Sequence, residues 1–227
     1  MTARICVSIL PKNVPEALNL IKKAELAKAD FVEVRLDSFE ETRNLSAITK
    51  NTNIPLIATN KLKSEKGFFF GTETERQQTL LNAAKSGFEY IDVDFCSSKR
   101  NDTLSKLRPL GVKAVISYHK FDGILTTSEL EKILDEEIAS GAEVCKIVLT
   151  ANQIEENLLV LNFVSSTSDK AKLVCFCMGE KGKTSRLLSP LFGAYFTFAS
   201  LESGNETATG QMGITAMKTA YQILGVP

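Results

Sequence analysis

Several kinds of residue are scarce in these 227 amino acids. There is a single histidine, His119, and no tryptophan. Neither sign of charge dominates, because 27 Lys and Arg residues balance 27 Asp and Glu residues and the formal net charge is zero. Without a basic surface field, we expect no nucleic-acid partner. No apolar run approaches the roughly eighteen residues that a transmembrane helix needs, so we expect no membrane partner either.

Cysteine is also sparse, and its pattern argues against a metal site. The cysteines are odd in number, each lies within or at the end of an apolar run, and only one histidine could join them as a zinc ligand. We therefore expect buried free thiols in a reducing cytoplasm, with zinc as the weaker alternative. The opening segment MTARICVSIL is typical of a first strand rather than of a signal peptide. The five are Cys6, Cys96, Cys145, Cys175 and Cys177.

Short apolar runs alternate with helix-like stretches along the whole chain. Such alternation predicts parallel strands joined by helical crossovers. Eight units averaging about 28 residues favour a compact (β/α)8 TIM barrel, in a single α/β domain over residues 1–227, rather than an open doubly wound sheet. The strand-like runs cover 4–10, 31–37, 54–60, 90–95, 112–119, 143–150, 172–178 and 192–199.

Three of the intervening stretches have clear helical patterns. Residues 15–29 place an apolar stripe on one face, made of Ala17, Leu20, Ile21, Ala24 and Leu26. Residues 128–142 open with a Ser-x-x-Glu capping signature and end near a glycine. Residues 213–225 form the last helix.

Barrel enzymes carry their reactive groups at the carboxyl ends of the strands. The second run ends in Glu33, Arg35 and Asp37, which alternate with apolar residues. A period of two places all three on one face, here the barrel interior. They are interpreted either as part of a functional site or as a buried cluster of ion pairs with a purely structural role.

The fifth and sixth runs carry two candidate catalytic groups. His119 ends the fifth run and has the one side chain whose ordinary pKa lies near neutrality. Lys146 lies among apolar neighbours in the sixth run, where desolvation favours a neutral, nucleophilic amine that forms a Schiff base with a ketone. The alternative is a lysine whose stem follows the barrel wall while its ammonium reaches water.

The segment MGEKGKTSR (178–186) superficially resembles a phosphate-binding P-loop. That motif requires glycine at position 177, which is cysteine, so a nucleotide site is not expected. The glycine-rich turn can still present the guanidinium of Arg186 to a carboxylate or a phosphate.

Five motifs in chain order resemble the type I 3-dehydroquinate dehydratases. They are ExRxD (33–37), SYHKF (117–121), VCKIVLT (144–150), MGEKGKTSR (178–186) and ATGQ (208–211). The resemblance extends from Ser8 to Gln211. It implies a (β/α)8 barrel that dehydrates the small molecule 3-dehydroquinate without metal or organic cofactor, in a family that is commonly homodimeric. A class I aldolase and a non-catalytic barrel that binds a small anion are the competing interpretations.

The resemblance also implies roles for individual residues. Lys146 matches the Schiff-base lysine, His119 the general acid and base, and Glu65 a glutamate close to that histidine. Arg186 matches the arginine that holds the substrate carboxylate. The remaining matches are substrate-binding positions, namely Ser8, Glu33, Arg35, Lys61, Thr207 and Gln211.

Two positions depart from the family pattern. The motif R-x-x-x-E-G-G reads KLKSEKG (61–67) here, so lysines occupy positions 61 and 66, and a lysine cannot reproduce bidentate arginine contacts. Thr207 replaces a serine in a polar loop between Gly204 and Gly210. We expect this loop to close over the substrate as a lid that becomes ordered with ligand.

Overall fold

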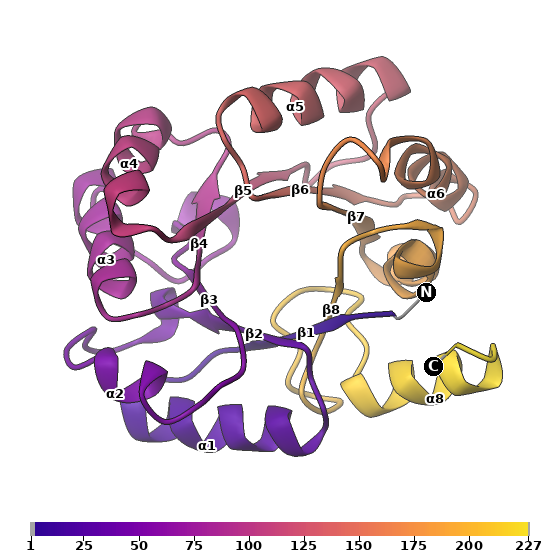
Figure 1. Cartoon of the computed structure of the whole chain (residues 1–227). Coiled ribbons are helices and arrows are strands. Elements are labelled where there is room, and N and C mark those ends of the chain that lie inside the picture. Colours follow the sequence, from indigo (N-terminus) through magenta and orange to yellow (C-terminus); the bar gives the residue numbers. More distant parts are fainter. Residues whose placement is uncertain (1–2, 227) are drawn as a thin grey trace.

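Eight parallel strands form the centre of the molecule in a computed structural model that describes residues 3–226 (Figure 1). The sheet order β7-β6-β5-β4-β3-β2-β1-β8 follows the chain around the ring. The predicted (β/α)8 barrel is confirmed, and the open sheet is wrong. The strands are β1 (Ile5–Ile9), β2 (Phe31–Arg35), β3 (Leu56–Thr59), β4 (Tyr90–Asp94), β5 (Lys113–His119), β6 (Val144–Thr150), β7 (Leu173–Met178) and β8 (Thr197–Ala199).

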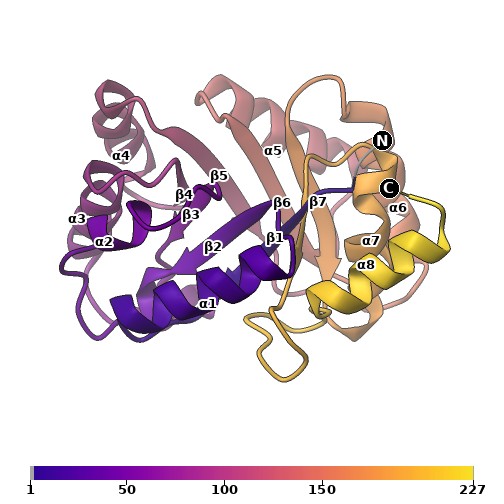
Figure 2. The ribbon, with the colours of Figure 1, turned by 60° about the horizontal axis from the view of Figure 1, so that its bottom comes forward.

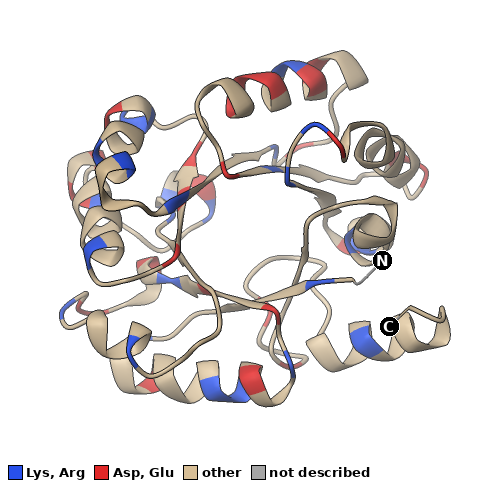
Figure 3. Cartoon of the chain, in the orientation of Figure 1, with Lys and Arg blue, Asp and Glu red and all other residues tan. Residues whose placement is uncertain are grey.

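Helices surround the strands and alternate with them, and Figure 2 shows the loop after β8 projecting from one end of the barrel. Acidic and basic residues are interspersed around this helical ring, as the balanced composition implies (Figure 3). The α-helices are α1 (Val14–Leu26), α2 (Ser46–Thr49), α3 (Glu73–Lys85), α4 (Arg100–Leu107), α5 (Thr127–Ala139), α6 (Glu156–Thr167), α7 (Lys183–Leu188) and α8 (Ile214–Ile223). Short 3-10 turns are η1 (Leu36–Ser38), η2 (Lys63–Glu65), η3 (Arg108–Leu110), η4 (Glu180–Gly182) and η5 (Ser189–Phe192).

The ring is closed less regularly between β7 and β8 than elsewhere. Tyr195 donates its backbone N–H to the carbonyl of Leu173 over 2.7 Å just before β8 begins. The eighth strand is shorter than the predicted 192–199: it begins at Thr197, and Phe192 instead ends the 3-10 turn η5.

Aromatic side chains fill the barrel at the amino ends of its strands. Phe31 and Tyr90 begin β2 and β4 and meet edge to face, with ring centroids 5.9 Å apart. Phe196 packs 4.8 Å from Phe31. This apolar floor leaves the carboxyl ends of the strands as the open half of the barrel interior.

Two helix predictions need local correction. In α1, Ala17, Ile21 and Ala24 are buried as expected, and Leu20 is half-buried. Leu26 is 75% exposed, because at 3.6 residues per turn it lies on the opposite face of the helix from Ala17. The capping box of α5 is formed by Thr126 and Glu129, two residues before the predicted pair.

Four of the five free thiols are buried, and Cys96 is exposed because β4 ends at Asp94 and the chain has already left the barrel. Cys175 and Cys177 lie on the outer face of β7 in one apolar cluster with Cys145. Within residues 3–226, none of the helices has the length and apolar character to cross a membrane.

Candidate active site

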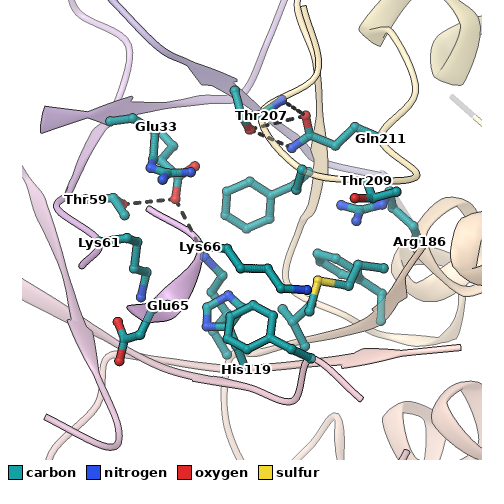
Figure 4. A pocket seen from close by; sticks show the side chains of 18 residues that line it. Glu33, Thr59, Lys61, Glu65, Lys66, His119, Arg186, Thr207, Thr209 and Gln211 are labelled. Atoms are coloured by element: carbon teal, nitrogen blue, oxygen red, sulfur yellow. Dashed lines mark hydrogen bonds and ion pairs between the residues drawn. The ribbon is translucent and has the colours of Figure 1, made fainter. Parts of the chain in front are cut away.

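A cavity of about 240 Å³ opens at the carboxyl ends of the strands (Figure 4). Nine of the ten predicted site residues line it; Ser8 does not. Residues from motifs far apart in the sequence therefore meet at one cavity in the barrel. The lining residues are Glu33, Arg35, Thr59, Lys61, Glu65, Lys66, His119, Phe121, Lys146, Val148, Phe176, Met178, Arg186, Phe198, Thr207, Ala208, Thr209 and Gln211.

Lys146 projects from the middle of β6 into this cavity. Its Nζ donates to Oδ2 of Asp92 over 3.2 Å and lies 3.6 Å from Oε1 of Glu33. The same nitrogen lies 4.3 Å from the ring centroid of Phe198. Only 5% of the residue is exposed, so its amine lies among carboxylates inside the barrel rather than at the outer surface.

His119 ends β5, the strand next to Lys146. Its ring stacks on Phe121 with centroids 6.0 Å apart and planes 11° from parallel. Burial lowers the pKa of His119 well below its ordinary value, and the charges of Lys61 and Lys146 lower it further. The imidazole is therefore neutral at pH 7 and is ready to accept a proton.

Two aspartates that the sequence interpretation missed lie beneath these groups. Asp92 and Asp94 project inward from β4, and Nζ of Lys61 donates to Asp92 over 2.9 Å, to Asp94, and to the Ser117 hydroxyl over 2.8 Å. Burial alone would lower the pKa of Lys61, but these two carboxylates raise it. The alternation in YIDVDF is the signal that could have found them, since it matches that of Glu33 and Arg35.

The carboxyl groups of Glu65 and Asp94 have pKa values shifted in opposite directions. Burial and repulsion from Asp94 together raise the pKa of Glu65 to about 8, although Lys61 and Arg76 oppose this shift. Burial opposes ionisation of Asp94 as well, but Lys61 lowers its pKa to about 2. Arg76 on α3 contacts Asp94 and lies 3.9 Å from Glu65. Glu65 is therefore the protonated member at neutral pH.

Ser8 lies behind the cavity rather than in its wall. Its hydroxyl donates to Oε2 of Glu33, while Thr59 donates to Oε1 over 2.9 Å. All three residues are buried and come from neighbouring strands. The two hydroxyls hold the Glu33 carboxylate beside Lys146.

Arg35 is held by a carboxylate just beyond its strand. Its guanidinium forms two hydrogen bonds with Asp37, of 2.8 and 2.6 Å. Asp37 also accepts from the backbone N–H of Phe68 over 3.0 Å, which ties η1 to the loop after β3. Glu33 and Arg35 face the cavity as predicted, but Asp37 does not line it, because β2 ends at Arg35 and Asp37 lies in η1. Arg35 and Asp37 satisfy each other, while Glu33 lies beside Lys146.

Arg186 differs from the other deeply buried cations of the cavity. Its guanidinium carbon lies 4.3 Å from the ring centroid of Phe176, and its Nε has no hydrogen-bond partner within residues 3–226. Burial lowers the pKa of Arg186 to about 9, so the group is still charged at pH 7. A charged guanidinium that faces a cavity without a protein carboxylate is suited to binding an anion.

The loop after β8 covers one side of the cavity. Thr207 and Gln211 bond to each other there: Nε2 of Gln211 donates to the Thr207 hydroxyl over 2.9 Å, and the Thr207 N–H donates back to Oε1 over 2.7 Å (Figure 4). The N–H of Gly179 donates to the carbonyl of Thr209 over 3.0 Å, which ties the loop to the end of β7. Both predicted lid residues therefore reach the cavity.

Comparison with known proteins agrees with this geometry. The family model described as Type I 3-dehydroquinase matches residues 5–227. A 3-dehydroquinate dehydratase of Dehalococcoides mccartyi is 36% identical over 208 residues, 92% of this chain and 90% of that protein. One from Methanococcus maripaludis is 30% identical over 222 residues, 97% and 99% of the two chains.

The fold is shared as well. The crystal structure of a 3-dehydroquinate dehydratase from Geobacillus kaustophilus superposes with a TM-score of 0.89 at 22% identity, and covers 99% of this chain and 92% of that one. Barrel, cavity and sequence similarity thus lead to one assignment: the chain belongs to the type I 3-dehydroquinase family.

Proposed function

We propose that this cavity dehydrates 3-dehydroquinate to 3-dehydroshikimate through an imine formed on Lys146, with His119 as the general acid and base. The dehydratase activity, a carbon–oxygen lyase step of the shikimate pathway, follows from the family. The observation that carries the mechanism is a buried lysine amine among two carboxylates, beside a histidine that is neutral at pH 7.

The reaction starts when the ammonium of Lys146 gives a proton to His119 and the free amine adds to the ring ketone. The resulting carbinolamine loses water, with His119 transferring protons, and gives an iminium ion. This cation takes the place of the ammonium beside Asp92 and Glu33, so the same carboxylates stabilise the charge before and after the step.

Elimination follows on the iminium. His119 removes a proton from the carbon next to the imine, whose positive nitrogen accepts the electron pair. The protonated His119 then donates to the departing hydroxyl, which leaves as water. Hydrolysis of the remaining imine releases 3-dehydroshikimate and restores the Lys146 amine. One neutral base thus serves both proton transfers.

The other lining residues bind and orient the substrate. Arg186 holds the carboxylate, Glu33 and Arg35 contact the ring hydroxyls, and Thr207 with Gln211 closes the loop above. Lys61 has three protein acceptors, so its proposed part is to fix Asp92 and Asp94 rather than to hold substrate. Ser8 acts through Glu33, and Glu65 adjusts the charge beside His119.

Borohydride trapping tests the proposal. The protein is incubated with 3-dehydroquinate, product is followed by the absorbance of the conjugated enone, and the mixture is reduced and digested. We expect 3-dehydroshikimate and a stable adduct on the peptide that bears Lys146. An adduct without this product would favour the aldolase interpretation, and neither signal in folded protein would favour a non-catalytic anion-binding barrel.

A further inference from the structure

We infer that Lys66 is a second binding residue for the substrate's carboxylate, which it holds from the open side of the cavity while Arg186 holds it from within. This rests on the proposed function, because the anion is taken to be the substrate of that reaction. Lys66 stands at the first glycine position of the R-x-x-x-E-G-G motif.

The charges that line the cavity separate into paired and unpaired groups. Arg35, Lys61 and Lys146 each lie within 4.0 Å of a carboxylate. Within residues 3–226 the structure gives no such partner to Lys66 or Arg186. Two unpaired cations that face one cavity attract an anion. A carboxylate bound only to the deeper cation, Arg186, would keep its outer side in water, and Lys66 lies on that side.

Lys66 ends η2 in a left-handed backbone conformation. Its φ is 59°, in the left-handed region that is costly for residues other than glycine. The next residue, Gly67, has no room for a side chain, because an added Cβ would overlap the carbonyl oxygen of Lys61. A costly conformation kept at the edge of an active site is a reason to look for a function.

The side chain of Lys66 extends across the cavity toward the side that holds Arg186 (Figure 4). Its Nζ lies 4.6 Å from the ring centroid of Phe121, the ring that stacks on His119. The ammonium thus rests against an aromatic face. A carboxylate is a stronger partner than this face, so substrate gains the contact without breaking a protein ion pair.

The same loop offers a matched control. Lys63 also carries its Nζ near an aromatic ring, 4.7 Å from the centroid of Phe70, but it does not line the cavity. Neutralising Lys66 or Lys63 changes the net charge equally. Only Lys66→Met removes a cation from the site.

Steady-state kinetics at low ionic strength give the first test. We expect Lys66→Met to raise KM by roughly 3- to 10-fold, the effect of one solvent-facing ion pair, with kcat within about twofold. Lys66→Arg should stay close to wild type, and Lys63→Met should match wild type. Lys66→Gly should also raise KM although glycine suits the backbone, so misfolding cannot explain the loss. An unchanged KM in Lys66→Met would overturn the inference.

A binding measurement keeps this test separate from the proposed function. Quinate, the alcohol that corresponds to the substrate, and its uncharged methyl ester are titrated by calorimetry into wild type and Lys66→Met. We expect quinate to weaken roughly 3- to 10-fold and the ester to change less than about twofold. Equal losses for both ligands would contradict a charge contact. Absence of turnover in wild type would remove the proposed function, while these titrations would still decide whether Lys66 binds an anion.

Discussion

The Nζ of Lys146 lies 3.2 Å from a carboxylate oxygen of Asp92, although the two residues come from β6 and β4, with β5 between them. Lys61 from the end of β3 reaches the other oxygen of Asp92 over 2.9 Å. One buried carboxylate therefore serves two lysines across four strands. This bridge keeps two cations together in a cavity where they would otherwise repel each other.

Replacement of the proposed nucleophile gives the first prediction. Lys146→Ala should abolish the borohydride adduct and reduce turnover to the background of the uncatalysed reaction, because the other amine beside Asp92, that of Lys61, is held by Asp94 and Ser117. Mass spectrometry of the reduced protein checks this. Lys172→Ala, at the surface, is the control and should keep full labelling. Labelling at an unchanged level in Lys146→Ala would place the imine elsewhere.

Loss of the proton carrier should have a different signature. His119→Ala should lower kcat by about 10²–10⁴-fold, the usual contribution of a general acid and base. The amine remains, so slow imine formation should still be trapped by borohydride. Rapid-quench mass spectrometry measures the covalent fraction over time. Near-normal turnover in this variant would show that another group carries the proton.

The raised pKa of Glu65 predicts a pH dependence of stability. Its folded pKa of about 8 lies above the ordinary value near 4.5, so the folded protein holds a proton that the unfolded chain has lost. The free energy of unfolding should therefore fall as pH rises from about 4.5 to 8, and Glu65→Gln should remove this part of the slope. Urea unfolding of both proteins at pH 5, 6.5 and 8 measures it.

Taking the difference between the two proteins cancels the contribution of His119, whose lowered pKa acts at the acid end. A second expected result concerns the pH dependence of kcat. The wild-type curve should show an inflection near pH 8 that is absent from the curve of Glu65→Gln. The same pH dependence of unfolding free energy in both proteins would contradict a protonated Glu65 at neutral pH.

The Asp92 bridge should matter for stability as well as for chemistry. Asp92→Asn leaves Lys61 and Lys146 with less negative charge in the barrel, and removal of one partner from a buried pair typically costs about 3 kcal/mol or more. Glu143→Gln, which removes a surface pair with Lys172, should change stability little. Urea unfolding with unchanged m values makes the two comparable. Equal effects would mean that burial does not strengthen the bridge.

Two glycines of the lid loop separate backbone freedom from docking. Gly204 and Gly210 both have positive φ, 92° and 77°, but only Gly210 packs so closely that an added Cβ would overlap the carbonyl of Gly179. Gly210→Ala should therefore displace the loop and lower kcat/KM by roughly 10-fold or more, since a displaced lid loses its contacts with substrate. Gly204→Ala shares the backbone penalty without the overlap and should retain most activity. Similar losses of kcat/KM in both variants would contradict a specific role for the packing of Gly210 against Gly179.

Sequence patterns determined a large part of this protein. Period-two and helical alternation predicted eight strand–helix units, because backbone geometry ties side-chain direction to those periods. The same alternation placed Glu33 and Arg35 inside the barrel. His119 and Lys146 were found because each is unusual where it stands: one is the sole histidine, the other a cation among apolar residues.

Tertiary structure alone decided the partners. Asp92 was visible in the sequence, yet its contact with Lys146 spans 54 positions and depends on how far neighbouring strands are staggered in the ring. Ser8 turned out to support Glu33 rather than to line the cavity, and Cys96 lay outside the barrel once β4 had ended. The raised pKa of Glu65 depends on burial and on the nearby charges of Asp94, Lys61 and Arg76. These contacts and pKa shifts depend on distances between segments that are far apart in the sequence, so a local sequence pattern cannot predict them.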